Sequence, residues 1–67
     1  MREELRKLLA AEPFRPFRVV MSSGNSYEVR SPYMIVIEED LATYFAQRTD
    51  LYSIIRLVQI SSVDIIE

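Results

Sequence analysis

The chain has 67 residues, of which 49% are hydrophobic and 27% charged, with a net charge of −2 and no cysteine, histidine or tryptophan. This composition predicts one small globular domain, residues 1–67, and excludes disulfide bonds, a zinc site of cysteine and histidine ligands, and catalysis by a thiol or by a Ser-His-Asp arrangement. A domain this short buries only about 60% of its unfolded surface, so we expect self-association to add to its stability.

The first element in the sequence is an amphipathic helix over about residues 2–11. Leu5, Leu8 and Leu9 follow Met1 at helical spacing and form one apolar stripe. Pro13 ends the helix, because the residue before a proline is disfavoured in the helical conformation. We expect the apolar stripe to pack on the strands that follow.

Residues 13–18 repeat the tripeptide Pro-Phe-Arg twice. In an extended polyproline conformation three residues make one turn, so Phe14 and Phe17 would both face the core while the two arginines stay in water. The same segment matches the PxxP pattern of SH3-domain ligands. We interpret it as structural, because Phe17 also begins the first predicted strand.

A β-hairpin is predicted between residues 17 and 31, where apolar positions alternate in both strands. A three-residue loop at 22–24 places Gly24, the one glycine of the chain, in the left-handed position of a bulge turn. A two-residue loop would mix apolar and charged side chains on one face, so the longer loop is preferred. Its register pairs Phe17 with Val29, Val19 with Tyr27, and Arg18 with Glu28 as an ion pair.

The remainder of the chain consists of predicted strands separated by polar turns. Pro32 ends the second strand, and the carboxylates at 38–40 form a solvated turn. Further strands are predicted over residues 33–37 (apolar on both faces, hence central or covered), 41–46, 51–60 and 63–66, with a polar loop at 47–50 and a kink at 61–62. The predicted fold class is α+β, mainly β: a helix followed by a five- or six-stranded antiparallel small barrel over about residues 17–66.

This order of elements resembles the Sm-like barrel, which includes the bacterial Hfq and archaeal LSm proteins. The resemblance lies in residues 17–24, as first strand and turn, and in residues 59–63, as the kink into the last strand. That family holds a base with an Asp and an Asn near its third strand, and residues 32–37 contain neither. Where Hfq-like proteins have Tyr-Lys-His, this chain has Arg56, Leu57 and Val58. The resemblance therefore implies the barrel without its uridine pocket.

A second resemblance concerns the pattern PFRPFR followed by a glycine and then YEVR. The pattern occupies residues 13–18, Gly24 and residues 27–30. It resembles a set of short uncharacterised bacterial proteins. Membership of that set implies no known activity.

Apolar residues are more numerous near the end of the chain than one face of a small barrel requires. An exposed apolar strand invites pairing with another chain. We therefore predict a homo-oligomer, with residues 51–66 as the interface. Its candidate interface residues are Ile54, Ile55, Leu57, Val58, Ile60 and Ile66.

A second candidate surface is basic. Residues 1–18 carry five cations and three anions, whereas the whole chain has a net charge of −2 and a pI near 5.1. Arg15 and Arg18 would contact phosphates, and Tyr27 or Tyr33 would stack on a base. Because nucleic-acid-binding domains are usually basic, RNA is a possible partner rather than the expected one.

The leading functional hypothesis is a small, non-enzymatic interaction module that self-associates through its C-terminal strands, without cofactor or metal. The first alternative is a divergent Sm-like RNA-binding protein. The second is an antitoxin-like or phage-encoded protein that binds another protein through its acidic face. The acidic start of the sequence and the absence of a long apolar run predict a cytoplasmic location and no membrane association.

Overall fold

The computed structural model describes residues 1–46 and 51–66 and contains one helix, one 3-10 helix and six strands within them. The helix α1 spans Arg2–Ala10 and the 3-10 helix η1 spans Leu57–Gln59. The strands are β1 (Phe17–Met21), β2 (Ser26–Val29), β3 (Ile35–Glu38), β4 (Leu41–Phe45), β5 (Tyr52–Arg56) and β6 (Ile60–Ile65). The α+β, mainly β class predicted from the sequence is therefore confirmed.

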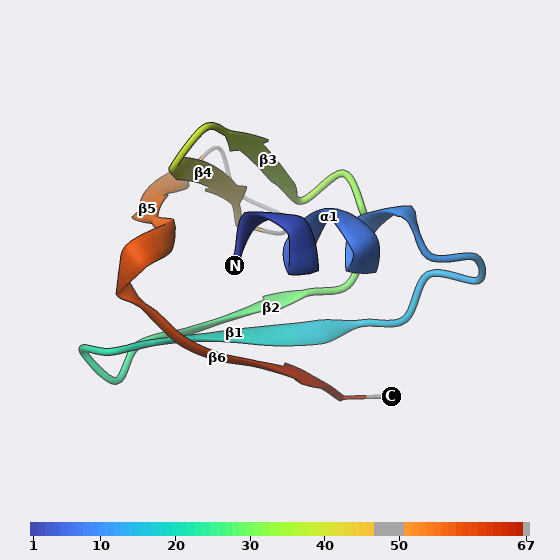
Figure 1. Cartoon of the computed structure of the whole chain (residues 1–67), viewed down its shortest axis with the longest axis horizontal. Helices are drawn as coiled ribbons and strands as arrows, with labels where there is room; N and C mark the ends of the chain where they lie inside the picture. Colours follow the sequence, from blue (N-terminus) through green and yellow to red (C-terminus); the bar gives the residue numbers. More distant parts are fainter. Residues whose placement is uncertain (47–50, 67) are drawn as a thin grey trace.

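The strands form two antiparallel three-stranded sheets. One has the order β2-β1-β6 and the other the order β3-β4-β5. In Figure 1 the first sheet lies along the bottom, β3 and β4 lie at the top, and α1 lies between them. The chain crosses from the upper sheet to the lower one through η1, so the two sheets are connected at this end by a tight turn.

The predicted hairpin register is confirmed. Phe17 pairs with Val29 and Val19 with Tyr27, and the main-chain N–H of Met21 donates to the carbonyl of Asn25 at 2.7 Å. Residues 22–24 therefore form the loop, and Gly24 has a φ of +98°, which favours glycine. The predicted ion pair is different: Glu28 pairs with Arg30 at 3.2 Å, not with Arg18. Residues 28 and 30 lie on the same side of one chain segment, which makes that pair available without crossing to β1.

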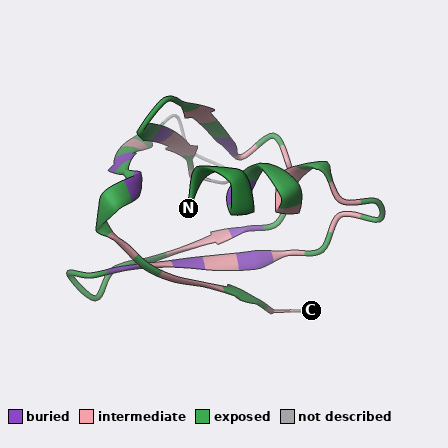
Figure 2. Cartoon of the chain, in the orientation of Figure 1, coloured by how far each residue is buried: buried purple, intermediate pink, exposed green. Residues whose placement is uncertain are grey.

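The core lies between the two sheets and under α1. Leu5, Phe17, Val19 and Val29 are fully buried, and Figure 2 shows buried positions in both sheets. Leu8 and Leu9 pack against this core from α1, as the apolar stripe predicts. The two rings of the Pro-Phe-Arg repeat, Phe14 and Phe17, meet with their centroids 6.0 Å apart, which confirms that both face the interior.

Two predicted strands differ from the structure. The third strand begins at Ile35 rather than at residue 33, because Ser31–Met34 form a turn in which the N–H of Met34 donates to the carbonyl of Ser31 at 3.1 Å. The continuous strand 51–60 is wrong: β5 ends at Arg56, η1 follows, and β6 begins at Ile60. The kink therefore lies at 57–59, before the predicted position at 61–62. The N–H of Leu57 donates to the carbonyl of Asp40 at 2.9 Å in the register of the β4–β5 ladder. The chain turns only after this bond, in η1, where the N–H of Ile60 donates to the carbonyl of Leu57.

Candidate interaction surface

The sheet β3-β4-β5 has two apolar faces. Its inner face carries Ile35, Ala42 and Ile55, which belong to the core. On the opposite face the alternate positions are also mostly apolar, and Ile54 and Tyr52 are 65% and 63% exposed. We call this second surface the outer apolar face; its exposed apolar residues are Val36, Leu41, Phe45, Tyr52 and Ile54.

Strand register arranges the outer apolar face in rows that run across the sheet. Val36 pairs with Thr43 and Thr43 with Ile54, which gives a central row with one polar member. A second row joins Phe45 to Tyr52. The third row consists of Glu38, Leu41 and Arg56, so that a carboxylate and a guanidinium stand on either side of a leucine.

No described element covers this face. Helix α1 lies between the two sheets in Figure 1 and buries its Leu5 completely in the core. The helix therefore packs on the inner side of the sheet β3-β4-β5 and leaves the outer apolar face uncovered. An antiparallel sheet with a solvated face usually alternates apolar and polar residues. Apolar residues on the solvated side of three adjacent strands therefore mark a surface suited to binding another apolar surface.

The six candidate interface residues lie in three different environments. Ile54 and Val58 are exposed, and Val58 is 82% exposed on η1. Ile55 and Leu57 belong to the core of the chain itself, so they have no surface to offer a partner. Ile60 and Ile66 are half-buried. Of these residues, only Ile54 belongs to the outer apolar face.

The remaining members of the outer apolar face were not singled out from the sequence. Val36 and Tyr52 lie in segments that were predicted as strands, but their side was not assigned to a surface. A signal existed in residues 33–37, whose apolar residues on both faces require a cover on each side. The strand register shows which of these residues share the outer face, because it places Val36 beside Thr43 and Thr43 beside Ile54.

The four candidate RNA contacts do not share one face of the fold. Arg18 and Tyr27 lie on opposite faces of the sheet β2-β1-β6, because Arg18 pairs with Glu28 whereas Tyr27 pairs with the buried Val19. Tyr33 is 87% exposed in the turn between β2 and β3. Arg15 is exposed in the segment before β1.

The electrostatic setting of Arg18 also differs from that of a phosphate-binding residue. On β1 it stands opposite Glu28 of β2 and opposite Asp64 of β6. Two carboxylates therefore border its position in the sheet, and they would repel a phosphate that approached it. These residues do not form a continuous basic surface.

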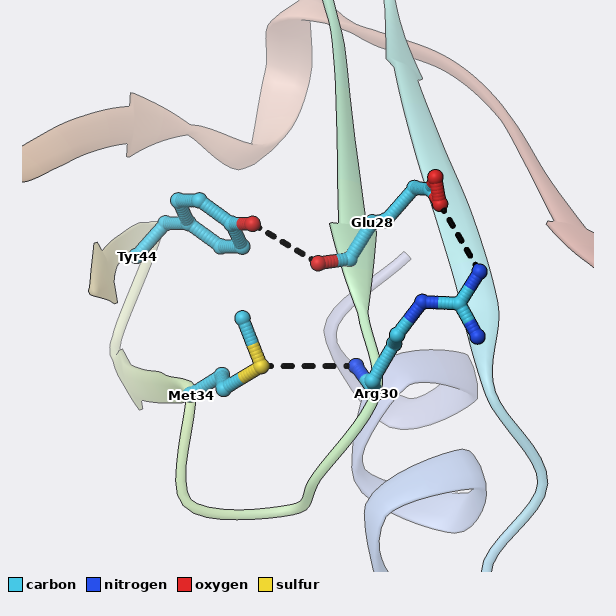
Figure 3. Close-up of polar contacts among 4 residues, drawn as sticks. All are labelled: Glu28, Arg30, Met34 and Tyr44. Carbon is cyan, nitrogen blue, oxygen red and sulfur yellow. Dashed lines mark hydrogen bonds and ion pairs between the residues drawn. The ribbon is translucent and has the colours of Figure 1, made fainter. Parts of the chain in front are cut away.

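A polar cluster joins the two sheets at the side where β2 and β3 are not paired. The hydroxyl of Tyr44, on β4, donates to the main-chain carbonyl of Glu28, on β2, at 2.7 Å (Figure 3). Its ring also packs on Tyr27, with centroids 5.0 Å apart. Nearby, the main-chain N–H of Arg30 donates to Sδ of Met34 at 3.4 Å. These contacts connect the sheets at a place where no strand ladder does so.

Burial raises the pKa of the Tyr44 hydroxyl, and the negative charge of Glu28 and the neighbouring Tyr27 add to the effect. The raised pKa keeps the hydroxyl protonated, which is the state that donates to the Glu28 carbonyl. The cluster borders a hollow of about 340 Å³ that also touches Ser26. The hydroxyl of Tyr44 and the N–H of Arg30 both bond to acceptors within the chain, so we interpret the cluster as a structural contact between the two sheets.

An open hollow of about 920 Å³ lies beside η1. Arg2, Glu39 and Asp40 line it together with apolar side chains of η1 and β6. Glu38, Glu39 and Asp40 are exposed, as expected for a solvated turn. In residues 1–46 and 51–66, no three or more Asp and Glu side chains are placed to hold a metal ion.

In comparisons with known proteins, no protein family, no curated protein and no solved structure matches the chain. Within the described part of the chain there is also no helix with the length and apolarity needed to cross a bilayer.

Proposed function

We propose that the chain is a small non-enzymatic interaction module that self-associates through the outer apolar face of β3-β4-β5. The observation that carries this proposal is the exposure of Val36, Leu41 and Ile54, one on each of three adjacent strands whose other face already supplies the core. Covering the face removes apolar surface from water, at roughly 25 cal/mol for each Å². This proposal narrows the interface from the whole of residues 51–66 to one sheet face.

We also propose that the two sheets form a small Sm-like barrel. Its support is that β1 pairs with both β2 and β6, while η1 carries the chain from the end of the second sheet back to the first. The buried residues of both sheets belong to one cluster, as the two halves of a barrel require. This proposal concerns the fold, and the uridine-binding residues of the Sm family play no part in it.

Size-exclusion chromatography with light scattering tests the functional proposal, with the wild type compared with Ile54→Glu over a range of concentrations. The wild type should exceed the monomer mass of 7.9 kDa as concentration rises. Ile54→Glu should remain monomeric, because burying an isoleucine contributes about 1.5–3 kcal/mol and a carboxylate in its place must be desolvated. A wild type that stays monomeric throughout would overturn the proposal.

Val58→Glu is the matched control, because Val58 is even more exposed but lies on η1, outside the outer apolar face. It should associate like the wild type. If Val58→Glu abolished association and Ile54→Glu did not, the interface would lie around η1 instead. Absorbance at 260 and 280 nm in the same run tests RNA binding, since excess absorbance at 260 nm reveals bound nucleic acid in a chain with four tyrosines and no tryptophan.

A further inference from the structure

The row of Glu38, Leu41 and Arg56 shows what kind of surface fits the outer apolar face. Glu38 is on the edge strand β3 and Arg56 on the edge strand β5, with Leu41 of the central strand between them. The two charged residues are separated by two strand spacings, roughly 10 Å between main chains. Both are exposed, and within the described residues neither forms an ion pair.

We propose that the partner is a second copy of this chain, packed face to face about a two-fold axis that runs along β4. Such an axis places β3 of one copy over β5 of the other at the same height. Glu38 of each copy then faces Arg56 of the other, and both ion pairs form at once, as an isologous interface requires. This inference rests on the proposed function and specifies the geometry of the self-association.

The other rows are compatible with the same axis. Val36 faces Ile54 of the second copy, and the converse contact forms on the other side of the axis. Thr43 and Leu41 belong to the central strand, so each lies over its own counterpart. Val36 and Ile54 therefore meet across the interface, Leu41 meets Leu41, the two Thr43 side chains meet at the centre, and the charges lie along one end. Two stacked sheets of this kind pack about 10 Å apart.

A two-fold axis across the strands is a poorer fit. It would place β3 over β3 and β5 over β5 in opposite directions. The row of Glu38 and Arg56 would then lie over the row of Phe45 and Tyr52, and Glu38 would have no cation to face. The charges thus select the axis along β4, because each carboxylate is otherwise left beside an apolar surface.

The dimension of the face sets the expected affinity. Three strands of at most five residues make a surface roughly 10 Å across, measured between the outer strands, and about 17 Å long. This is at the small end of specific interfaces. We expect a dissociation constant in the micromolar range, so the experiment must extend from about 1 μM to about 1 mM.

Charge reversal tests the geometry. In Glu38→Arg or in Arg56→Glu alone, both ion pairs of the dimer become repulsive, and the dissociation constant should rise on the order of 10- to 100-fold. In an equimolar mixture of these two variants, each chain supplies the charges that the other needs, so dimers should return. The double variant E38R/R56E should dimerise by itself. Analytical ultracentrifugation at low salt measures all four samples.

Glu39→Arg is the control for net charge, because Glu39 lies in the turn between β3 and β4 and has no position on the outer apolar face. It should dimerise like the wild type. The double variant keeps one charge of each sign on the face, so it tests the proposal even where a single variant loses its fold.

Two results would overturn the inference while leaving the proposed function intact. In the first, the single variants dissociate but neither the mixture nor the double variant restores the dimer. In the second, charge reversal has no effect although Ile54→Glu abolishes association, so that the copies meet in another geometry. A wild type that is monomeric up to about 1 mM, well above the micromolar range expected for a small interface, would overturn both proposals.

Discussion

The hydroxyl of Tyr44 offers a sharp test of how the two sheets are held together. It donates to the carbonyl of Glu28 at 2.7 Å, across the gap where β2 and β3 are unpaired. Tyr44→Phe removes this oxygen and keeps the ring that packs on Tyr27. The variant therefore deletes one hydrogen bond between the sheets and leaves the aromatic contact in place.

The magnitude follows from the character of the bond. It is short, joins two uncharged groups, and lies in a half-buried position where water can partly replace the lost donor. A bond of this kind contributes about 1 kcal/mol to the free energy of unfolding. In a domain of this size, 1 kcal/mol lowers the melting temperature by about 4–8 °C. Thermal unfolding followed by circular dichroism measures the difference.

Tyr27→Phe is the matched control for this experiment. The hydroxyl of Tyr27 makes no hydrogen bond with any described residue, although its ring stands in the same stack. Its removal should change the stability by less than about 0.5 kcal/mol. Equal melting temperatures for Tyr44→Phe and Tyr27→Phe would refute the claim that the bond to Glu28 stabilises the joint between the sheets.

The same residue predicts a dependence of stability on pH. The folded state raises the pKa of Tyr44, chiefly by burial and further through the charge of Glu28. The contribution of the protonated Tyr44 hydroxyl to the free energy of unfolding is therefore fully present below the pKa of tyrosine in the unfolded chain, about 10. It is lost as the pH rises through the higher pKa of Tyr44 in the folded chain. Tyrosinate absorbance should show one late-titrating tyrosine, and that late step should disappear in Tyr44→Phe.

Four further substitutions test local conformation and core packing by urea unfolding. Gly24→Ala should destabilise by about 1–2 kcal/mol, because its φ of +98° strains any residue with a Cβ, while a Cβ there would touch nothing within 4 Å. Glu39→Gly should act in the opposite direction and add up to about 1 kcal/mol, because Glu39 has a φ of 52°; a loss of stability would contradict the conformational argument. Leu5→Ala should cost about 2–5 kcal/mol, because Leu5 is completely buried, and Leu8→Ala should cost less, because Leu8 is half-buried.

Local patterns predicted the parts of the fold whose interactions are local. The helix ends at Ala10, one residue before the predicted end, because Pro13 follows closely. The register of the first hairpin follows from one glycine and the need to keep Phe17 and Val19 on the inner face. In these elements the local sequence pattern and the tertiary packing favour the same conformation, so the predictions agree with the structure.

The long predicted strand 51–60 failed because strand propensity depends on tertiary context. Its residues are mostly β-branched or aliphatic, and nothing local marks a break. The break arises because β5 pairs with β4 whereas β6 pairs with β1, so the chain must change sheets after Leu57, whose N–H still bonds the carbonyl of Asp40 in the β4–β5 register. A contact between residues 17 positions apart leaves no local sequence signal.

The sequence predicts that the chain has surplus apolar residues, but it does not predict which of them are exposed. Counting apolar residues near the end of the chain shows a surplus, but it cannot assign Ile54 to the solvent and Ile55 to the core. That assignment depends on the pairing of β5 with β4, where Thr43 meets Ile54 and Ala42 meets Ile55. Because neighbouring residues in a strand point to opposite faces, a register shift of one residue would exchange them.

The contrast between the two sheets supports the proposal that the outer apolar face binds a second copy of the chain. On the outer side of β2-β1-β6 the register aligns Arg18 with Glu28 and with Asp64, as on a sheet face that contacts water. The same chain places Ile54 and Val36 on the outer side of β3-β4-β5. An overall excess of hydrophobic residues would affect both sheets. An apolar outer side confined to one sheet, with opposite charges at its two edges, is what a surface that packs on a second copy of itself requires.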